Sequence, residues 1–302
     1  SDQDWDDNAE FSLENGQSVD MFVVRKANVL QLNFYGAVTY ERHYTIFKDQ
    51  LDSAFEGPAQ FGRFMAMVTQ NCLDIIEQTR ENLARATIAN FIAGKVAAAG
   101  QAGSDGVVHL VTEYNAETGE TLTSSTIYAP ENVGNFVKWA YARISDLTKL
   151  MEERSQKFQI QVEGNTLNRH TPLEMQKVYL FSKLLEQINA RVKADTYHDT
   201  FLELSDVDTV SYFQSIEDRQ KVQVKPSYLL PDGTIGTTDA AITVQNIAGV
   251  IFDEEALGMT VVNEWSATTP LNARGGYWNI FYHFTQRYFN DFSEKGIVLL
   301  LD

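Results

Sequence analysis

Histidine, cysteine and serine are the residues of this chain that could act as metal ligands or nucleophiles. The five histidines lie at positions 43, 109, 170, 198 and 283. Their spacing fits none of the short motifs that hold a metal ion, such as two histidines four residues apart on a helix. The single cysteine, Cys72, excludes an intrachain disulfide, and Ser124 has no base near it in the sequence. We therefore expect no catalytic, metal-binding or cofactor-binding residues and no enzymatic activity.

Glycines and carboxylates also give no recognisable site. Gly275 and Gly276 do not form a phosphate-binding loop, which needs a strand before it and a helix after it, so we expect them to form a tight turn. The 41 acidic residues are numerous enough to include close pairs, but on such an acidic chain most of them are expected to form a solvated surface.

Composition sets the broad class of the protein. The chain has 302 residues, of which 44% are hydrophobic, enough for a sizeable core. No run of 18 apolar residues could span a membrane. The net charge of −17 argues against non-specific binding to nucleic acid, because phosphate contacts need clustered Lys and Arg. We expect a soluble protein that could lie beside DNA without gripping it.

Three segments are predicted to be helical. From Pro58, apolar residues recur at every third or fourth position, which predicts one helix over about residues 58–98. At about 1.5 Å per residue this helix would be roughly 60 Å long. Further helices are predicted over 130–151 and 175–193. The helix over 175–193 is preceded by a capping-box-like sequence, Thr171 to Glu174.

Strand patterns occur between and beyond these helices. Leu30 to Phe34 alternates apolar and polar residues, as in a half-buried strand. The full set of strand signals covers 19–44, 107–111, 121–127, 158–162, 222–224, 250–252, 259–262 and 296–301. Helices and strands follow no regular βαβ alternation, so the predicted fold class is α+β.

The densest apolar block lies near the end of the chain. Eight aromatic residues fall between Tyr277 and Phe292, and an aliphatic strand signal, 296–301, follows them. We expect this block and the last strand to close a core, because an end of the chain that frayed would expose a large apolar surface.

Two stretches carry a resemblance to a known family. Ile46 to Phe64 and Thr268 to Asn279, the second reading TTPLNARGGYWN, resemble the major capsid proteins of tailed phages, in particular those of small short-tailed phages of Gram-positive bacteria. The order of elements is also similar to the Hong Kong 97-type major capsid fold: extended β-ribbon loop, long spine helix, peripheral domain and axial domain. The resemblance covers nearly the whole chain.

The resemblance implies a domain organisation. It places an extended-loop segment at 1–45, a peripheral domain with the spine helix at 46–172, an axial domain at 173–272 and a return to the peripheral domain at 273–302. Only eighteen residues, six of them acidic, precede Val19, where family members carry an N-terminal arm, so we expect that upstream residues are missing.

The resemblance also implies a function. It predicts a head protein that assembles with itself into hexamers and pentamers of an icosahedral shell around double-stranded DNA, in the host cytoplasm and then in the virion. Its partners would be further copies of itself, a scaffolding protein, a portal and decoration proteins. Two alternatives stay open at this point, an encapsulin-like nanocompartment shell and an acidic α+β hydrolase.

We expect the contacts between subunits to come from the extended loop and from the turn before the aromatic block. The candidate residues are Arg25, Lys26, Tyr35, Tyr40, Arg42, Asn272 and Arg274. Basic side chains at loop tips would meet acidic patches on a neighbouring copy, where an exposed ion pair contributes about 1 kcal/mol or less.

Overall fold

One long helix, α2 (Pro58–Ala99), runs through the whole molecule. Proline is favoured in the first turn of a helix, because that turn has no use for its missing N–H. The prediction of a helix over about 58–98 is confirmed. With 42 residues the helix is roughly 60 Å long.

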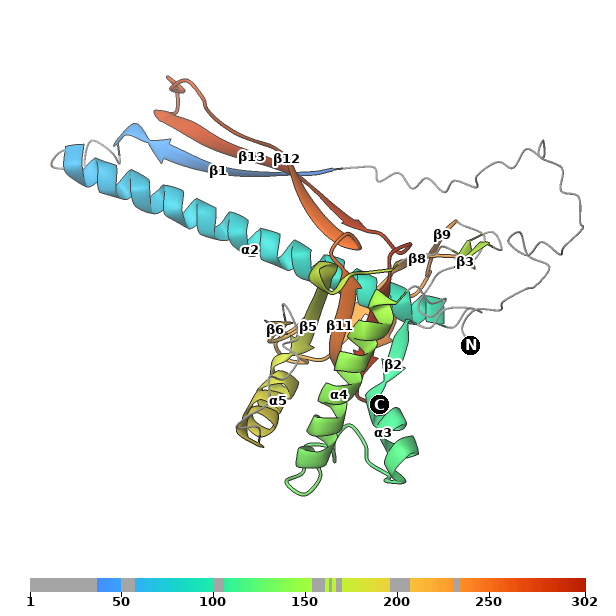
Figure 1. The fold of residues 1–302 in the computed structure, drawn as a ribbon. Helices are drawn as coiled ribbons and strands as arrows, with labels where there is room; N and C mark the ends of the chain where they lie inside the picture. Colours follow the sequence, from blue (N-terminus) through green and yellow to red (C-terminus); the bar gives the residue numbers. More distant parts are fainter. Residues whose placement is uncertain are drawn as a thin grey trace, which may run out of the picture.

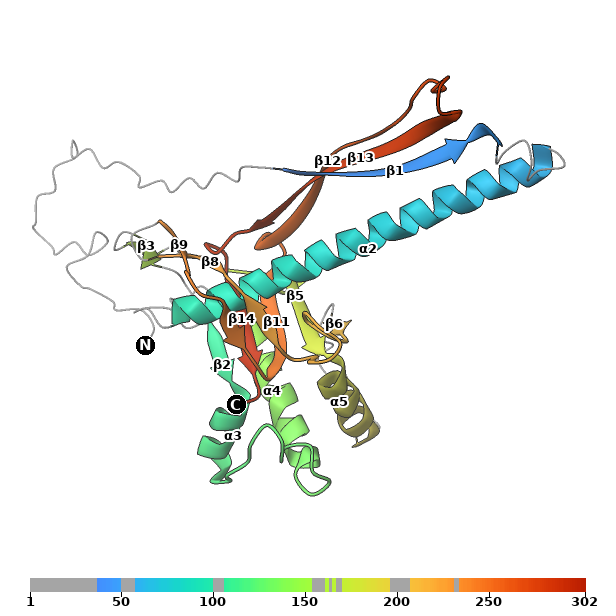
Figure 2. The same cartoon turned by 180° about the vertical axis from the view of Figure 1, so that it is seen from behind.

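The computed structural model describes residues 37–49, 58–99, 106–153, 161–162, 165–166, 170–195, 207–230 and 234–302. They form two parts, which we call the arm and the body (Figure 1). The arm consists of strands β1 (Val38–Phe47), β12 (Leu257–Thr268) and β13 (Tyr277–Asn290), with the hairpin tip between β12 and β13 and residues 58–86 of α2. The body contains the other described elements and the C-terminal end of α2, as the view from behind also shows (Figure 2).

A five-stranded sheet forms the centre of the body, in the order β2-β14-β11-β5-β6. The outer pairs β2–β14 and β5–β6 are parallel, and the inner pairs are antiparallel. These strands are β2 (Val107–His109), β14 (Gly296–Leu300), β11 (Ile247–Asp253), β5 (Gln176–Phe181) and β6 (Val207–Val210).

Helices and short strands cover this sheet. The helices are α3 (Leu110–Thr118), α4 (Val133–Glu152), α5 (Ser182–Asp195) and the 3-10 turn η1 (Leu173–Met175). The short strands are β3 (Gln161–Val162), β4 (Asn165–Thr166), β7 (Val222–Val224), β8 (Ser227–Leu229), β9 (Ile235–Thr237) and β10 (Ile242–Val244). They pair as β3–β4, β7–β10 and β8–β9.

The sheet is buried on both faces, which explains its nearly continuous apolar strands. In β14, Ile297 and Leu299 join the hydrophobic cluster with α3, α4 and α5, whereas Val298 and Leu300 join the cluster with the end of α2. Successive side chains of a strand point to opposite faces, so one five-residue strand contributes to two cores. The expectation that the last strand closes a core is confirmed for 296–300.

The aromatic block that precedes β14 lies mostly in the arm rather than in the body. Residues 277–290 form β13 of the arm, and only Phe284 and Gln286 in this strand are buried. The prediction that the block closes the core is therefore wrong for residues 277–290, whereas Phe292, the last ring of the block, is buried in the cluster with the end of α2. Aromatic residues favour strands because they fit a half-buried pleated surface, and their density does not say which part of the molecule the strand joins.

Three other local predictions are wrong. The strand predicted over 107–111 ends at His109, and α3 follows because Leu110, Val111 and Tyr114 share one buried helix face. Residues 121–127 form turns rather than a strand. The first part of the helix predicted over 175–193 is strand β5, whose burial between β11 and β6 overrides its helical spacing.

The packing of the body crosses the predicted boundary at 172. Leu110 of α3 and Ile144 of α4 share one buried cluster with Leu180 of β5, Leu184 of α5 and Leu299 of β14. Segments assigned in advance to the peripheral and the axial domain therefore share one core.

Two buried lysines lie where the arm meets the body. Lys95 of α2 is 4% exposed, and its Nζ donates a hydrogen bond to the main-chain oxygen of Glu294 at 3.0 Å. Burial lowers the pKa of Lys95 to about 8, against the opposing attraction of Asp291 and Glu294. Burial also lowers the pKa of Lys295, whose Nζ donates to main-chain oxygens at the end of α4.

Replacing Lys95 by Met should change how stability depends on pH. The folded pKa of Lys95 lies near 8 and its ordinary value is 10.5, so between these values the unfolded chain binds more protons and stability rises with pH. We expect the free energy of unfolding of the parent protein, relative to Lys95→Met, to rise by about 3 kcal/mol from pH 7 to pH 10.5. Urea unfolding across this range measures it, with exposed Lys149→Met as the control. A flat difference would contradict the prediction.

Two glycines of α2 should respond oppositely to replacement by alanine. A Cβ at Gly94 would lie 2.5 Å from Cε1 of Phe292 and 2.8 Å from the main-chain oxygen of Ser227, whereas a Cβ at Gly62 meets nothing within 4 Å. Gly94→Ala should destabilise the protein by about 1–3 kcal/mol through overpacking. Gly62→Ala should stabilise the helix by up to about 1 kcal/mol. Hydrogen exchange along α2 measures both, and stabilisation by Gly94→Ala would refute the close packing.

Candidate assembly surface

The sheet of the arm is a three-stranded antiparallel ribbon in the order β1-β13-β12. β13 is the central strand, pairing with β1 from Val38↔Gln286 to Phe47↔Tyr277 and with β12 along most of its length. Within the described ranges, β1 and β12 each leave one edge without a partner strand. Such edges expose unpaired main-chain groups that can bind another chain.

A small hydrophobic contact holds this sheet to α2. Cys72 and Ile76 of the helix pack against Phe284 of β13 and are buried with it. Tyr40 of β1 stacks on Phe284, with ring centroids 5.2 Å apart. Burial raises the pKa of Tyr44 on the same face, and a hydrogen bond to Cys72 contributes to the same shift. We call these residues the seam. Cys72 is 1% exposed.

An ion-pair cluster lies beside the seam. Arg80 of α2 donates to Oε1 of Glu77 at 3.0 Å and bridges to Glu264 on β12. Asp74, Glu77 and Glu81 follow one another at helical spacing on the side of α2 that carries Arg80. Two shallow pockets, of about 680 and 270 Å³, lie on either side of Arg80. Arg85 also pairs with Glu81, at 2.7 Å. The surface is acidic, since these three carboxylates and Glu264 outnumber the two arginines.

The outer surface of the arm is unusually apolar. Among the described residues, nine of the eleven large hydrophobic side chains that are exposed belong to the arm. They are Val38, Phe47, Met67, Leu73, Met259, Val261, Val262, Trp265 and Leu271. Exposed apolar side chains gathered on one part of a protein indicate a surface that binds a partner.

A row of rings crosses the three strands of the arm. Trp265 of β12 stacks on His283 of β13, with centroids 4.1 Å apart, and is 50% exposed. Phe281 continues the row to His43 of β1, with centroids 6.2 and 5.6 Å apart. His283 therefore lies on the sheet of the arm. Aromatic residues on an accessible surface are typical of interfaces.

The tip of the arm is a turn that presents a basic side chain. Oδ1 of Asn272 accepts hydrogen bonds from the main-chain N–H groups of Arg274 and Gly275, at 3.1 and 3.0 Å. Gly276 has a φ of +62°, which glycine adopts easily, so the expected tight turn is confirmed. Arg274 is exposed at the end of this turn. The adjacent end of β1 joins the tip through a hydrogen bond from Lys48 N–H to the main-chain oxygen of Gly276.

The predicted contact residues fall into three groups. Arg42 and Arg274 are exposed on the arm, where a neighbour could reach them. Tyr40 belongs to the seam, and Asn272 shapes the tip through its side chain, so both act inside the subunit. Arg25, Lys26 and Tyr35 lie outside the described residues.

The sequence reasoning missed the apolar surface of β12. Its run 259–262 was recognised as a strand but not as an exposed one, although Trp265 follows among polar residues. It also missed the acidic cluster on α2, for which the spacing of Asp74, Glu77 and Glu81 was an available signal.

Within the described ranges, no three His, Cys, Asp or Glu residues lie close enough together to hold a metal ion. None of the described helices has the length and hydropathy needed to cross a membrane.

Comparison with known proteins decides the family. The family model described as Phi29-like phage major capsid protein matches residues 3–299. This chain belongs to that family. It is a phage major capsid protein, a component of the virion head that assembles with itself into a shell. The nanocompartment and hydrolase alternatives receive no support. No curated protein sequence matches the capsid protein.

Solved structures show the fold. The capsid protein is similar to a chain in the structure of the head fibre and inner core protein gp22 of native bacteriophage P68, with a TM-score of 0.58, 10% identity, and 89% of this chain and 72% of that chain covered. It is also similar to a chain in the capsid of Staphylococcus phage Andhra, with a TM-score of 0.53, 10% identity, and 88% and 70% covered. The predicted α+β fold of the Hong Kong 97 type is confirmed.

Phe284→Ala should loosen the arm from α2. This substitution removes the buried ring of the seam, and truncating a buried Phe costs about 3–5 kcal/mol. We expect hydrogen exchange to accelerate at residues 72–76 and along β1, while β14 in the body keeps its protection. The control is Phe281→Ala, which removes a half-buried ring of the same strand. Equal acceleration in both variants would mean that the seam does not hold the arm.

Proposed function

We propose that this capsid protein forms hexamers and pentamers that close into an icosahedral shell around double-stranded DNA, and that the arm carries the contacts between neighbouring subunits. The observation that supports this most strongly is the gathering of nine exposed large hydrophobic residues on the arm. An isolated subunit would expose them to water, whereas a ring of subunits would bury them repeatedly.

The tip of the arm and the acidic cluster on α2 have complementary chemistry. The tip presents the basic side chains of Arg274 and Lys48 beside exposed Leu271. The cluster presents Asp74, Glu77, Glu81 and Glu264 around Arg80, beside exposed Met259 and Trp265.

We infer a head-to-tail contact in which the tip of one subunit lies on the acidic cluster of the next. Because the two patches differ, the contact repeats from subunit to subunit, and a rotation that closes gives a ring. An arginine that reaches Trp265 would also gain a cation–π interaction.

The charge of the chain suits a container wall. At a net charge of −17 the inner surface of a shell would not hold the packaged polyanion tightly, since phosphate binding needs clustered basic residues.

We keep a scaffolding protein, a portal and decoration proteins as proposed partners. We keep the division of the chain into a peripheral and an axial domain as a proposal. The core that α3, α4 and β5 share is treated as one unit in it.

Arg274→Glu should impair assembly without unfolding the subunit. The change replaces attraction to the acidic cluster by repulsion at every copy of the contact, and each exposed pair is worth about 1 kcal/mol or less. We expect the protein concentration for half-maximal assembly to rise about tenfold. Light scattering and negative-stain microscopy measure it.

Two further variants make this test specific. Lys225→Glu changes the charge equally at an exposed position of the body and should assemble normally. Glu77→Lys combined with Arg274→Glu should recover part of the lost assembly. Normal assembly by Arg274→Glu alone would refute the proposed contact.

A further inference from the structure

Within the described part of the chain, the sheet of the arm has two free edges, and they differ in character. The β1 edge carries three consecutive residues that are charged or can become so, Glu41, Arg42 and His43. In β12 the last ten of twelve residues are exposed, and its one charged residue, Glu264, is paired with Arg80. Charged side chains protect an edge strand from pairing with other chains. By this criterion the β1 edge is protected and the β12 edge is not.

The side chains of β12 also favour an added strand. Met259, Val261, Val262 and Trp265 are each between 47% and 50% exposed. Aromatic and β-branched residues pack well against a neighbouring strand. A long apolar edge of this kind takes up a further strand, whose main chain continues the sheet.

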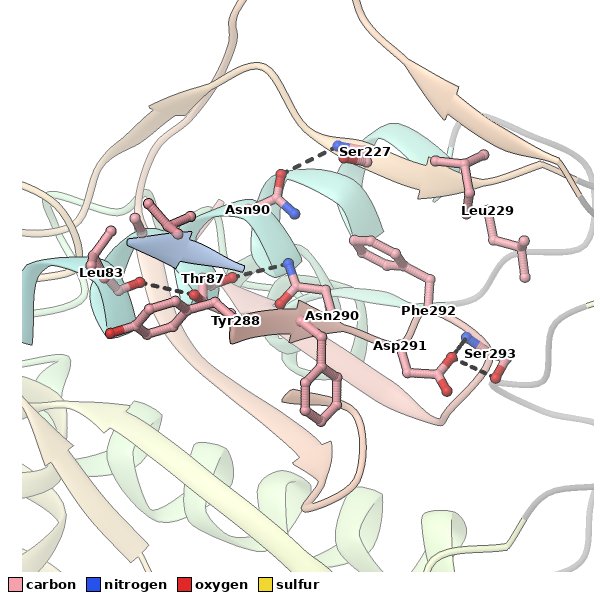
Figure 3. A pocket seen from close by; sticks show the side chains of 14 residues that line it. Leu83, Thr87, Asn90, Ser227, Leu229, Tyr288, Asn290, Asp291, Phe292 and Ser293 are labelled. Atoms are coloured by element: carbon pink, nitrogen blue, oxygen red, sulfur yellow. Dashed lines mark hydrogen bonds between the residues drawn. The ribbon is translucent and has the colours of Figure 1, made fainter. Parts of the chain in front are cut away.

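A hydrogen bond at the root of the arm shows which face of the sheet lies towards α2. Nδ2 of Asn290 in β13 donates to the main-chain oxygen of Thr87 in α2 at 3.2 Å, beside an apolar pocket of about 500 Å³ (Figure 3). Leu257 of β12 lies opposite Asn290, and opposed residues share a face. Because side chains alternate, Met259 and Val261 lie on the α2 face as well.

A β-bulge reverses this alternation in the middle of β12. The register shifts by one residue between Val261 and Asn263, so that Val262 is the additional residue. Beyond the bulge, Glu264 reaches Arg80 of α2. Odd-numbered residues of β12 therefore face α2 before the bulge, and even-numbered residues face it afterwards.

The bulge makes β12 symmetrical about its midpoint. The strand runs from 257 to 268, so the midpoint lies between residues 262 and 263, at the bulge. If two copies of β12 paired antiparallel about this point, Met259 would lie opposite Ser266, and Val261 opposite Glu264. Both members of each pair lie on the α2 face. Without the bulge they would lie on opposite faces, and this register could not form.

We propose that β12 of one subunit pairs antiparallel with β12 of a second copy along residues 257–268, about a two-fold axis at the bulge. The inference rests on the proposed shell and adds a contact to it. Rings built by a head-to-tail contact need another contact to join one ring to the next, and a two-fold contact between identical patches supplies it. The tip of the arm lies outside the paired length and remains available within the ring.

Charge favours a second copy of β12 as the occupant of this edge. At a net charge of −17, most contacts between two subunits bring carboxylates together. The β12 edges avoid this, because Glu264 is neutralised by Arg80 of its own subunit. The β1 edge of a neighbour would instead bring Glu41, Arg42 and His43 against an apolar strand, where their charges would lose water.

The helices and bodies have room in this arrangement. The seam places α2 against β13, and the two copies of β13 would lie three strand spacings apart, about 14 Å. A helix with its side chains is about 10–12 Å wide, so two can lie side by side. β12 leaves the body at Leu257 and reaches the tip after Thr268, so antiparallel pairing puts the two bodies at opposite ends of the joined sheet (Figure 1).

Single cysteines test the pairing in the full chain under assembly conditions. A residue near a two-fold axis meets its own copy, so the Cα atoms of two Val262 residues would lie about 6 Å apart, within reach of a disulfide. Thr268, exposed on the same strand, would lie more than about 30 Å from its copy. After mild oxidation, Val262→Cys should give about tenfold more disulfide-linked dimer than Thr268→Cys. Cys72 is kept because it is buried, and the parent protein reports its background.

A mixture of two variants tests the register. Met259→Cys and Ser266→Cys subunits should form a disulfide with each other, and little with their own kind. Equal dimer from Val262→Cys and Thr268→Cys would indicate parallel or random association and overturn the proposal. A disulfide between Val262→Cys and Thr39→Cys subunits would place the β1 edge there and also overturn it. So would shells of Val262→Cys that form normally without any disulfide.

This result can be separated from the proposed ring contact. Arg274→Glu changes the tip and leaves β12 intact, so Val262→Cys should still cross-link in that background. Loss of the cross-link there would overturn an independent β12 contact, whereas normal assembly by Arg274→Glu alone would overturn only the ring contact.

A charge at the axis gives a second test without cysteines. Val262→Lys would place two like charges side by side, so negative-stain microscopy should show separate rings in place of closed shells. Thr39→Lys adds the same charge to the exposed β1 edge and should assemble normally. Normal shells from Val262→Lys, or loss of the rings themselves, would overturn the proposal.

Discussion

The structure depends on one helix that takes part in two separate hydrophobic contacts. Near its C-terminal end, Phe91, Ile92 and Ala93 of α2 are completely buried against the sheet of the body. Some fifteen residues earlier, Cys72 and Ile76 hold the arm through the small seam with Phe284. Because an α-helix is stiff over this length, the large core sets the direction of the helix and the helix carries the sheet of the arm. The seam needs only to hold the sheet of the arm against α2.

This arrangement separates stability from assembly. The body buries most of the hydrophobic core, with its five-stranded sheet covered on both faces. The arm buries little and exposes much, including two strand edges and the side chains of Met259, Val262 and Trp265. The hydrophobic core that holds the subunit together therefore lies mainly in the body. Under the proposed assembly, the arm would complete its burial through contacts between copies.

The sequence predicted the parts of the fold that local spacing determines. The helix over 58–99 has a long apolar stripe and a favourable proline at its start, so its prediction needed no knowledge of the rest of the chain. The strand at 176–181 was predicted as helix because its apolar spacing fits both periods, and only burial between two other strands decides between them.

The candidate surface was predicted less well, for a physical reason. Arg274 could be assigned to an exposed turn from its glycine neighbours, and Arg42 to a ribbon strand. The role of Asn272, however, depends on hydrogen bonds within the turn, and that of Tyr40 on a ring from a strand more than 200 residues away. The aromatic block 277–292 was assigned to a core because composition cannot distinguish burial inside a subunit from partial burial on a surface that neighbours cover.

The charge of the chain opposes random association through such an apolar arm. At −17, two subunits repel each other over the range of the Debye length, about 8 Å at physiological ionic strength. The exposed apolar side chains of the arm attract only at contact, and the basic side chains of the tip are among the few positive charges that could meet an acidic neighbour. Repulsion at a distance therefore opposes random association, while the proposed oriented contact of tip and acidic cluster would remove part of it. Contacts that form only in the correct orientation, and that are individually weak, allow a misplaced subunit to leave before the shell closes around it.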